Sequence, residues 1–257
     1  MIKAAFFDVD GTLFSHTKHE TSESTKRALR KLQEKGILIF AATGRHYLEL
    51  ERFPVSDIAF DGYVLLNGQF CADKNKALLF GCPVDGEDVK SLLKIFEKKE
   101  TPMTIIQKDR MFINFVNEAV VKTQEAVSSV PAMIGEYQGG EIYQVIAYLT
   151  RDEEAAFVKN VPNSRITRWQ EGGVDIISKT GGKAAGIEKM LELYGMNREE
   201  IIAFGDGEND IEMLEYAKIG VAMGNASDIV KEKADYVTDH IDEDGIEKAL
   251  RHFGLIE

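Results

Sequence analysis

The sequence predicts an α/β protein in which a doubly wound parallel sheet of the Rossmann-like type forms a core domain, with an α+β domain inserted into it. Near both ends of the chain, short apolar runs alternate with amphipathic stretches, as in parallel sheets that helices cover on both faces. Between residues 83 and 180 this alternation gives way to paired short strands. We therefore expect the core at 1–82 and 181–257, and the inserted domain at 83–180.

The first part of the chain alternates strands with helices. Ile2–Phe7 is a short apolar run followed by acidic residues, which is typical of a buried parallel strand. Thr21–Lys35 carries its apolar residues on one helical face and is followed by Gly36, a common helix stop. Two further buried strands are expected at Ile37–Ala42 and Tyr63–Leu66. This order implies a parallel sheet with helices on both faces.

The middle of the chain has a different pattern from its last part. The middle elements are expected as a helix at Asp85–Lys99, strands at Thr104–Gln107 and Met111–Asn114, a helix at Asn117–Val127, a strand at Tyr143–Leu149, a helix at Thr150–Lys159, and strands at Arg165–Trp169 and Val174–Ile177. The doubly wound pattern then returns, with strands at Ile201–Phe204 and Ile219–Ala222 and helices at Gly182–Tyr194, Asp210–Tyr216, Ala226–Lys233 and Gly245–Phe253.

Composition limits the classes of function. With 44% hydrophobic and 29% charged residues, the chain can bury an ordinary core, which excludes a fully disordered protein. The net charge of −12 argues against a nucleic-acid surface or an anionic membrane surface, because both need basic patches. Two cysteines cannot form a disulfide framework, and no apolar run approaches the roughly 18 residues of a membrane helix. The first residues resemble a strand and not a signal peptide, so a cytoplasmic location is expected.

Two aspartates follow the first expected strand, in the stretch Asp8-Val9-Asp10-Gly11-Thr12-Leu13. A carboxylate at a strand end can act as a metal ligand or a covalent nucleophile, and a second one nearby can donate and accept a proton. The alternative is a solvated loop with helix-capping aspartates. A calcium loop of the EF-hand type is excluded, because His19 stands where its glutamate would be.

Two shorter motifs suit a phosphoryl group. Thr43-Gly44-Arg45 follows the second expected strand, where a hydroxyl and a backbone N–H at a helix start can bind phosphoryl oxygens. Lys183 lies early in a helix after two glycines, and a lysine there can neutralise phosphate and pair with a nucleophilic carboxylate. The alternatives are a plain helix cap for the first motif and an exposed helix lysine for the second.

The fourth motif, Gly205-Asp206-Gly207-Glu208-Asn209-Asp210, follows another strand. Three acids gathered at a strand end repel one another unless a cation is bound, and oxygen ligands favour Mg²⁺ over zinc. Because the carboxyl ends of parallel strands form one crevice, the four motifs are expected to converge. No histidine and cysteine cluster has zinc spacing, and His16 and His19 are expected to be solvated in a polar loop.

Taken in this order, the four motifs resemble those of the haloacid dehalogenase-like (HAD) superfamily, and most closely its Cof-type phosphatases. Asn67-Gly68, Gly220–Ala226, Ala234–Thr238 and Glu243–Gly245 also follow that subfamily's pattern. The resemblance covers the whole chain and is weakest across 83–175. It implies that the inserted domain is an α/β cap of the C2B-like type.

The resemblance also implies residue roles. Asp8 would be the nucleophile that forms an aspartyl-phosphate, and Asp10 the general acid/base. The implied Mg²⁺ ligands are Asp8, the backbone carbonyl of Asp10, and Asp206, with Asp210 as a ligand or a partner of the ligands. The residues implied in phosphate binding are Thr43, Gly44, Arg45, Lys183 and Asn209.

The chain departs from the family pattern near the lysine. Gly182 stands where the family commonly has Ser or Asn, and Lys179 competes for the lysine's role. In the family the lysine follows an acidic residue of the last cap strand by eight positions. The residue eight positions after Asp175 is Lys183, so we prefer Lys183 to Lys179 for this role.

The function expected from this resemblance is Mg²⁺-dependent hydrolysis of small-molecule phosphate monoesters, such as sugar phosphates. Two alternatives stay open: a phosphotransferase or phosphomutase with the same intermediate, and a non-catalytic sensor of a phosphorylated ligand. The expected partner is a small phosphorylated metabolite, because a lid of about a hundred residues would exclude macromolecules. No nucleic-acid or membrane partner is expected, and the protein is expected to be a monomer or homodimer.

Overall fold

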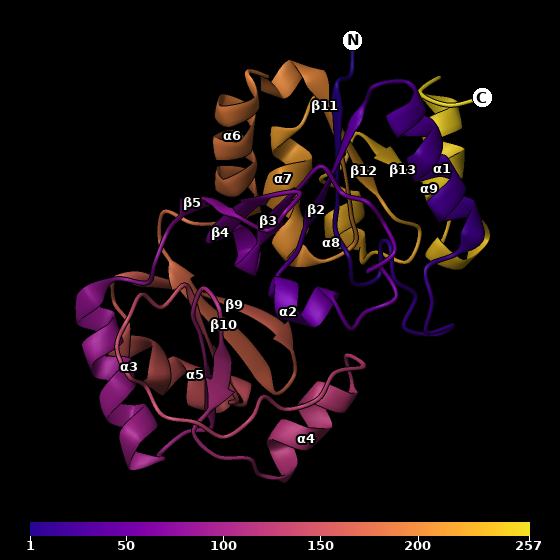
Figure 1. The fold of residues 1–257 in the computed structure, drawn as a ribbon. Helices are drawn as coiled ribbons and strands as arrows, with labels where there is room; N and C mark the ends of the chain where they lie inside the picture. The colour runs from indigo at the N-terminus through magenta and orange to yellow at the C-terminus, as the bar shows by residue number, and fades with distance from the viewer. The chain divides into compact units, whose positions relative to one another are not determined.

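The computed structural model describes residues 1–257, which fold as two compact units. The core unit comprises Met1–Phe80 and Gly182–Glu257, and the inserted unit comprises Gly81–Gly181. Figure 1 shows the helices and strands of each unit. The two units are described separately below.

An eight-stranded sheet of mainly parallel strands runs through the core unit, in the order β13-β12-β11-β1-β2-β3-β4-β5. Neighbouring strands from β13 to β3 are parallel, whereas β3 and β4 are antiparallel. The strands are β1 (Ala4–Phe7), β2 (Leu38–Ala42), β3 (Gly62–Leu65), β4 (Phe70–Asp73), β5 (Leu78–Gly81), β11 (Ile201–Gly205), β12 (Ile219–Ala222) and β13 (Tyr236–Val237). The α/β prediction is confirmed.

Helices follow most of the parallel strands, as the sequence predicts. The α-helices of the core unit are α1 (Glu23–Glu34), α2 (Tyr47–Leu50), α6 (Lys183–Tyr194), α7 (Ile211–Tyr216), α8 (Asp228–Lys231) and α9 (Gly245–His252). Helix α1 begins where the Ser22 side chain accepts a hydrogen bond from the Thr25 backbone N–H, which satisfies one of the free donors of the first turn. No helix of the chain has the length and apolar character that crossing a membrane requires.

Three strands and one helix of the core unit were not predicted from the sequence. Strands β4 and β5 extend the sheet beyond the turn at Asn67-Gly68, and β13 adds a two-residue edge. Helix α2 has only four residues. Strand β13 and helix α2 carry too few residues to show a hydrophobic period, whereas β4 and β5 are as long as β1 and form through pairing with a neighbouring strand.

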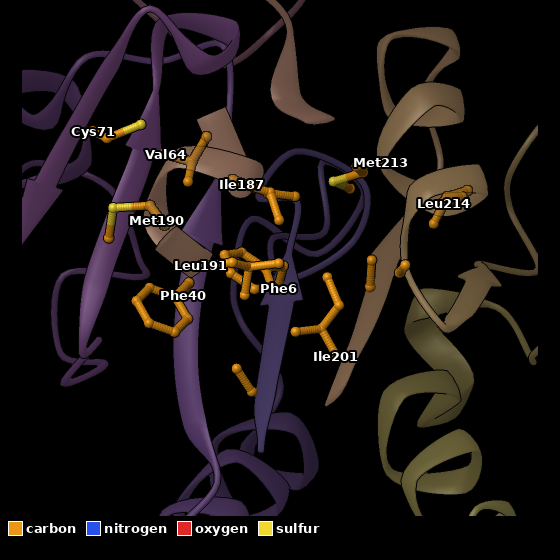
Figure 2. Close-up of a cluster of buried hydrophobic side chains, with 14 of the residues drawn as sticks. Phe6, Phe40, Val64, Cys71, Ile187, Met190, Leu191, Ile201, Met213 and Leu214 are labelled. Atoms are coloured by element: carbon orange, nitrogen blue, oxygen red, sulfur yellow. The ribbon is translucent and has the colours of Figure 1, made fainter. Parts of the chain in front are cut away.

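The core behind the site is packed from the sheet and α6. The rings of Phe6 in β1 and Phe40 in β2 stack with centroids 4.7 Å apart. Ile187 and Met190 of α6 are fully buried in the same cluster (Figure 2). This packing fixes the ends of β1, β2 and β11, where the candidate site lies, relative to the start of α6.

The inserted unit contains a five-stranded antiparallel sheet in the order β7-β6-β8-β10-β9. Its elements are α3 (Gly86–Lys98), β6 (Met103–Ile106), β7 (Met111–Ile113), α4 (Glu118–Glu125), β8 (Gln144–Ala147), α5 (Arg151–Phe157), β9 (Ser164–Gln170) and β10 (Gly173–Ser178). Its apolar cluster joins α3 and α5 to alternate residues of the strands, among them Val174 and Ile176 of β10. The two residues share one sheet face, as the two-residue period of a strand requires.

Candidate active site

The loop after β1 carries the first two aspartates. Phe7 pairs with Phe204 of β11 and Ala41 of β2, so the residues that follow these strands emerge at one edge of the sheet. The loop turns tightly, since the Val9 carbonyl accepts hydrogen bonds from the N–H groups of Leu13 (3.0 Å) and Phe14 (2.8 Å). The chain therefore presents Asp8 and Asp10 at this edge.

Gly11 in this loop cannot be replaced without displacing an acidic side chain. Its φ is +81°, which favours glycine, and a Cβ there would lie 2.2 Å from Oδ2 of Asp206. The β1 loop therefore leaves no room for a side chain at Gly11 beside the carboxylate of the β11 loop.

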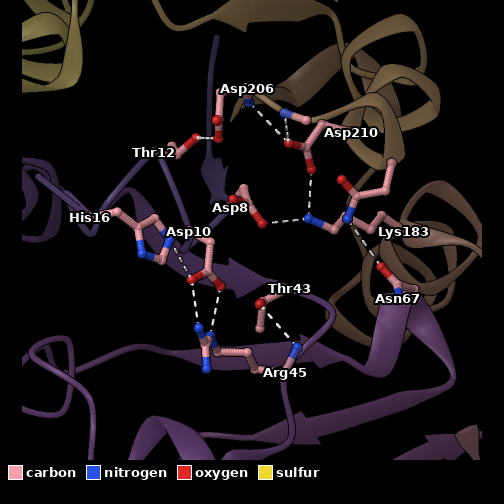
Figure 3. A network of polar contacts seen from close by, with 12 residues as sticks. Asp8, Asp10, Thr12, His16, Thr43, Arg45, Asn67, Lys183, Asp206 and Asp210 are labelled. Carbon is pink, nitrogen blue, oxygen red and sulfur yellow. Dashed lines mark hydrogen bonds and ion pairs between the residues drawn. The ribbon is translucent and has the colours of Figure 1, made fainter. Parts of the chain in front are cut away.

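Three carboxylates from distant parts of the sequence meet at this edge of the sheet. Asp8, Asp206 and Asp210 each offer an oxygen, and these atoms all lie within 4.8 Å of one another. Figure 3 shows Asp8 and Asp210 at the end of Lys183, and Asp206 beside Thr12. Asp206 and Asp210 come from the turn between β11 and α7, so strand pairing brings them beside Asp8.

Neutral donors hold Asp206 in place. The Thr12 hydroxyl donates to its Oδ1 at 3.0 Å, and the amide of Asn225 donates to its Oδ2 at 3.4 Å. The same amide donates to the Gly11 carbonyl at 2.8 Å, and the Asn225 side-chain oxygen accepts from the Ile241 N–H. Asn225 thus joins the loops around Asp206 without supplying a positive charge.

Lys183 is the one cation that contacts Asp8. It begins α6, is 1% exposed, and its Nζ lies 2.5 Å from Oδ1 of Asp8 and 2.6 Å from Oδ1 of Asp210. The other oxygen of Asp210 accepts hydrogen bonds from the backbone N–H groups of Asp206 and Gly207. Both oxygens of the fully buried Asp210 are therefore engaged, which suits a residue that holds Lys183 and the β11 loop.

The acidic cluster carries more negative charge than Lys183 compensates. Burial and the neighbouring Asp210 raise the pKa of Asp8 well above its usual value despite the nearby Lys183. The same two causes raise the pKa of Asp206 to about 7. A divalent cation would offset the repulsion between these buried carboxylates. Their oxygen-only donor set fits Mg²⁺. These residues therefore fit the metal that the sequence motifs imply.

Asp10 lies in a different environment from the acidic cluster. Arg45 binds its carboxylate with two donors, Nε to Oδ2 and Nη2 to Oδ1, both at 2.7 Å. Nε2 of His16 lies 3.0 Å from Oδ1 (Figure 3). Burial alone would raise the pKa of Asp10, but the hydrogen bonds from His16 and Arg45 outweigh it and lower this pKa to about 2.

The remaining residues predicted for phosphate binding lie along the same edge. The buried Thr43 follows β2, and its hydroxyl accepts a hydrogen bond from the Arg45 N–H at 3.1 Å. A Cβ on Gly44 would lie 3.2 Å from the amide nitrogen of Asn67. The side-chain oxygen of Asn67 accepts from the amide of Asn209 at 3.2 Å. The motif after β2 and the motif after β11 are thereby connected.

A family profile described as haloacid dehalogenase-like hydrolase matches residues 5–250 of this chain. The chain belongs to this family. The resemblance to the HAD superfamily and its Cof-type phosphatases is therefore confirmed.

Individual HAD proteins agree with this assignment. The chain is 33% identical to the putative phosphatase YkrA of Bacillus subtilis over 260 residues, which cover 99% of both chains. A HAD-superfamily phosphatase of known structure from Bacteroides thetaiotaomicron is 33% identical, with a TM-score of 0.89 over 100% of this chain and 96% of the other. A solved sugar phosphatase of HAD subclass IIB is 36% identical, with a TM-score of 0.87 over 99% and 100%. The expected enzyme class, a HAD-like phosphatase, is confirmed.

Three polar residues of this HAD site were missed or misjudged from the sequence. His16 was expected to be solvated, but it is only partly exposed and contacts Asp10, because the loop after Gly11 folds back on the site. Thr12 and Asn225 lie within stretches that the family resemblance already covers, but nothing in the sequence alone indicates that both contact Asp206. The competing Lys179 lies in the inserted unit, where its Nζ donates to the Pro162 carbonyl.

Proposed function

We propose that the protein hydrolyses small phosphate monoesters in a Mg²⁺-dependent reaction that forms an aspartyl-phosphate on Asp8. The observation that carries this proposal is the position of the Asp8 carboxylate, buried beside Lys183 and within 4.8 Å of oxygens of Asp206 and Asp210. A buried nucleophile next to a lysine and an acidic cation site is the arrangement that phosphoryl transfer requires.

In the first step, an oxygen of Asp8 attacks phosphorus in line with the ester bond. A bond forms between this oxygen and phosphorus and the ester P–O bond breaks, while Asp10, which is protonated in the substrate complex, gives its proton to the leaving alcohol oxygen. Lys183 and the Thr43 hydroxyl hold the charge on the phosphoryl oxygens, with Gly44 and Asn209 lining the same edge. For Arg45, the two-donor ion pair supports a role in holding Asp10 rather than in binding phosphate.

In the second step, water attacks phosphorus and releases Asp8. Asp10 takes the water's proton, the new P–O bond forms, and the bond to the Asp8 oxygen breaks. Inorganic phosphate leaves, and both aspartates return to their starting states. The ion pair with Arg45 and the contact with His16 favour the unprotonated form of Asp10, which is the form that takes a proton in this step.

The residues proposed to hold Mg²⁺ are Asp8, the backbone carbonyl of Asp10, and Asp206. When bound, the ion neutralises the repulsion between Asp8 and an anionic substrate. Because both oxygens of Asp210 are engaged by Lys183 and by backbone N–H groups, we assign it the role of orienting the other groups. We therefore propose Asp210 as a partner of the ligands and not as a ligand itself.

The proposed substrates are sugar phosphates or related small metabolites. A relative named as a sugar phosphatase matches 99% of the chain at 36% identity, which supports this class. We propose that the inserted unit, residues 81–181, acts as the cap that selects the leaving group and excludes water during the reaction. The relatives reported above are described as phosphatases, which supports hydrolysis over the phosphotransferase and sensor alternatives.

The test is release of inorganic phosphate from a panel of phosphorylated metabolites by the purified protein with Mg²⁺. We expect turnover of one or more sugar phosphates, and none by an Asp8→Asn variant that circular dichroism shows to be folded. Multiple turnover by that variant would rule out the covalent step. Conversion of one phosphate ester into another without phosphate release would favour the phosphotransferase alternative.

A further inference from the structure

His16 makes a contact with Asp10 that neither the motifs nor the family assignment predicts. Its Nε2 lies 3.0 Å from Oδ1 of Asp10, and its side chain is 32% exposed. Nδ1 on the other side of the ring is buried and has no hydrogen-bond partner. A buried Nδ1 without an acceptor favours the tautomer with its proton on Nε2, which is the one that donates to Asp10.

His16 makes the two oxygens of Asp10 inequivalent. Arg45 gives one donor to each oxygen, so by itself it does not distinguish them. His16 adds a second donor on Oδ1 only, so that Oδ1 accepts two hydrogen bonds and Oδ2 accepts one. Each carboxylate oxygen has two lone pairs, so Oδ2 keeps one for exchanging a proton.

An aromatic pair holds both donors in position. The Phe14 and Phe53 rings contact each other with centroids 4.5 Å apart. The edge of the His16 ring packs on Phe14 at 4.9 Å and 83°, and the Arg45 guanidinium lies 3.9 Å from the centre of Phe53. The two donors are therefore fixed by packing, as a group that must orient a catalytic carboxylate needs to be.

We infer that His16 is a positioning residue that binds Oδ1 of Asp10 and leaves Oδ2 to transfer the proton to and from the substrate oxygen. This inference rests on the proposed role of Asp10 as general acid/base. It adds to the site a residue from the loop after Gly11. It predicts that loss of His16 slows proton transfer to the leaving group and leaves binding of the phosphoryl group unchanged.

The experiment compares two substrates whose leaving groups differ in their need for a proton. An alkyl phosphate such as a sugar phosphate needs one, whereas 2,4-dinitrophenyl phosphate releases a stable anion. For His16→Phe, which keeps an aromatic ring but has no donor, we expect kcat/KM for the alkyl ester to fall about tenfold, the worth of one hydrogen bond to a charged group. For the dinitrophenyl ester, kcat/KM stays within about twofold, since no proton is transferred in its first step.

Two further variants separate positioning from a structural effect. His16→Gln carries an amide N–H that can reach the same oxygen, and we expect it to recover most of the activity on the alkyl ester. His19→Asn removes the other histidine of this loop and tolerates the φ of +54° found there, so it serves as the matched control with unchanged kinetics.

Several results would overturn the inference. These are an equal loss on both esters, no loss on either, or no recovery by His16→Gln while its melting temperature matches the wild type. Failure of the wild-type protein to release phosphate from any ester would overturn the proposed function, and this inference with it. If the wild-type enzyme is active and the ratio of kcat/KM between the two esters is the same for His16→Phe as for the wild type, this inference alone is overturned.

Discussion

The Nζ of Lys183 lies 2.5 Å from Oδ1 of Asp8, although 175 positions separate the two residues in the sequence. Both are buried, and the same Nζ also contacts Asp210. This ion pair connects the end of β1 with the start of α6 and places the only directly paired cation at the proposed nucleophile. The stability and the chemistry of the site therefore depend on the same contact.

Replacement of Lys183 by methionine should destabilise the protein strongly. The change leaves the buried Asp8 and Asp210 carboxylates without their cation, which typically costs about 3 to 5 kcal/mol. Urea unfolding at pH 8 in EDTA measures the loss. The matched control is Lys189→Met on the same helix, where the exposed lysine pairs only with Glu192 and little change is expected.

A second substitution tests the cause of this loss. Asp210→Asn in the Lys183→Met background removes one of the two uncompensated charges and should restore part of the unfolding free energy. If the double variant is no more stable than the single one, loss of packing and not of charge compensation explains the effect.

The acidic cluster should make the metal-free protein less stable as the pH rises. The pKa of Asp206 is about 7 in the folded state and near 3.9 in an unfolded chain, so folding favours its protonated form between these values. Its contribution is fully present below pH 4 and is lost as the pH rises to 7. In EDTA, Asp206→Asn should therefore melt several degrees above the wild type at pH 8, with the difference shrinking toward pH 5.

Melting temperatures of the wild type and Asp206→Asn, measured between pH 5 and pH 8, test the direction of this pH dependence. Asp235→Asn is the control, because that carboxylate accepts a backbone N–H of Gly220 away from the cluster. An Asp206→Asn variant that is less stable than the wild type at pH 8 in EDTA would contradict the repulsion that we describe.

Removal of divalent cations should abolish activity reversibly. Burial and the neighbouring Asp210 raise the pKa values of Asp8 and Asp206, so Mg²⁺ should stabilise the folded protein, and more at pH 8 than at pH 6. We expect EDTA to stop phosphate release, and Mg²⁺ to restore it and raise the melting temperature. Full activity in metal-free buffer would refute the assignment of the ligands.

Gly11→Ala should disable the site through a steric conflict with Asp206. The new Cβ would lie 2.2 Å from Oδ2 of Asp206, so one of the two loops must move. We expect activity to be lost along with the Mg²⁺-dependent rise in melting temperature.

Gly36→Ala provides the matched control for Gly11→Ala. Its φ of +77° is close to the +81° of Gly11, but nothing lies within 4 Å of its Cβ position. Both variants place an alanine in the left-handed backbone conformation, which costs about 1 to 2 kcal/mol of folding free energy. Only Gly11→Ala should therefore lose the response to Mg²⁺, and an equal response in both variants would show that contact with Asp206 is unimportant.

The sequence alone determined the parallel strands of the core and the residues at their ends. Apolar runs such as Ile2–Phe7 and Ile201–Phe204 are buried on both faces, so the residues that follow them, Asp8 and Asp206, could be placed at one sheet edge. The family resemblance, through the spacing from Asp175, also favoured Lys183 over Lys179. These are local features, and a continuous stretch of sequence is enough to predict them.

Only the tertiary structure decided which polar atoms contact one another. Whether Asp210 holds Lys183, and whether His16 contacts Asp10, depends on loops that fold back from outside the strands. The short strands β4, β5 and β13 likewise form because a neighbouring strand offers hydrogen bonds, not because their residues show a period. Such contacts join residues far apart in the chain, and their geometry is set by the packing of the whole unit.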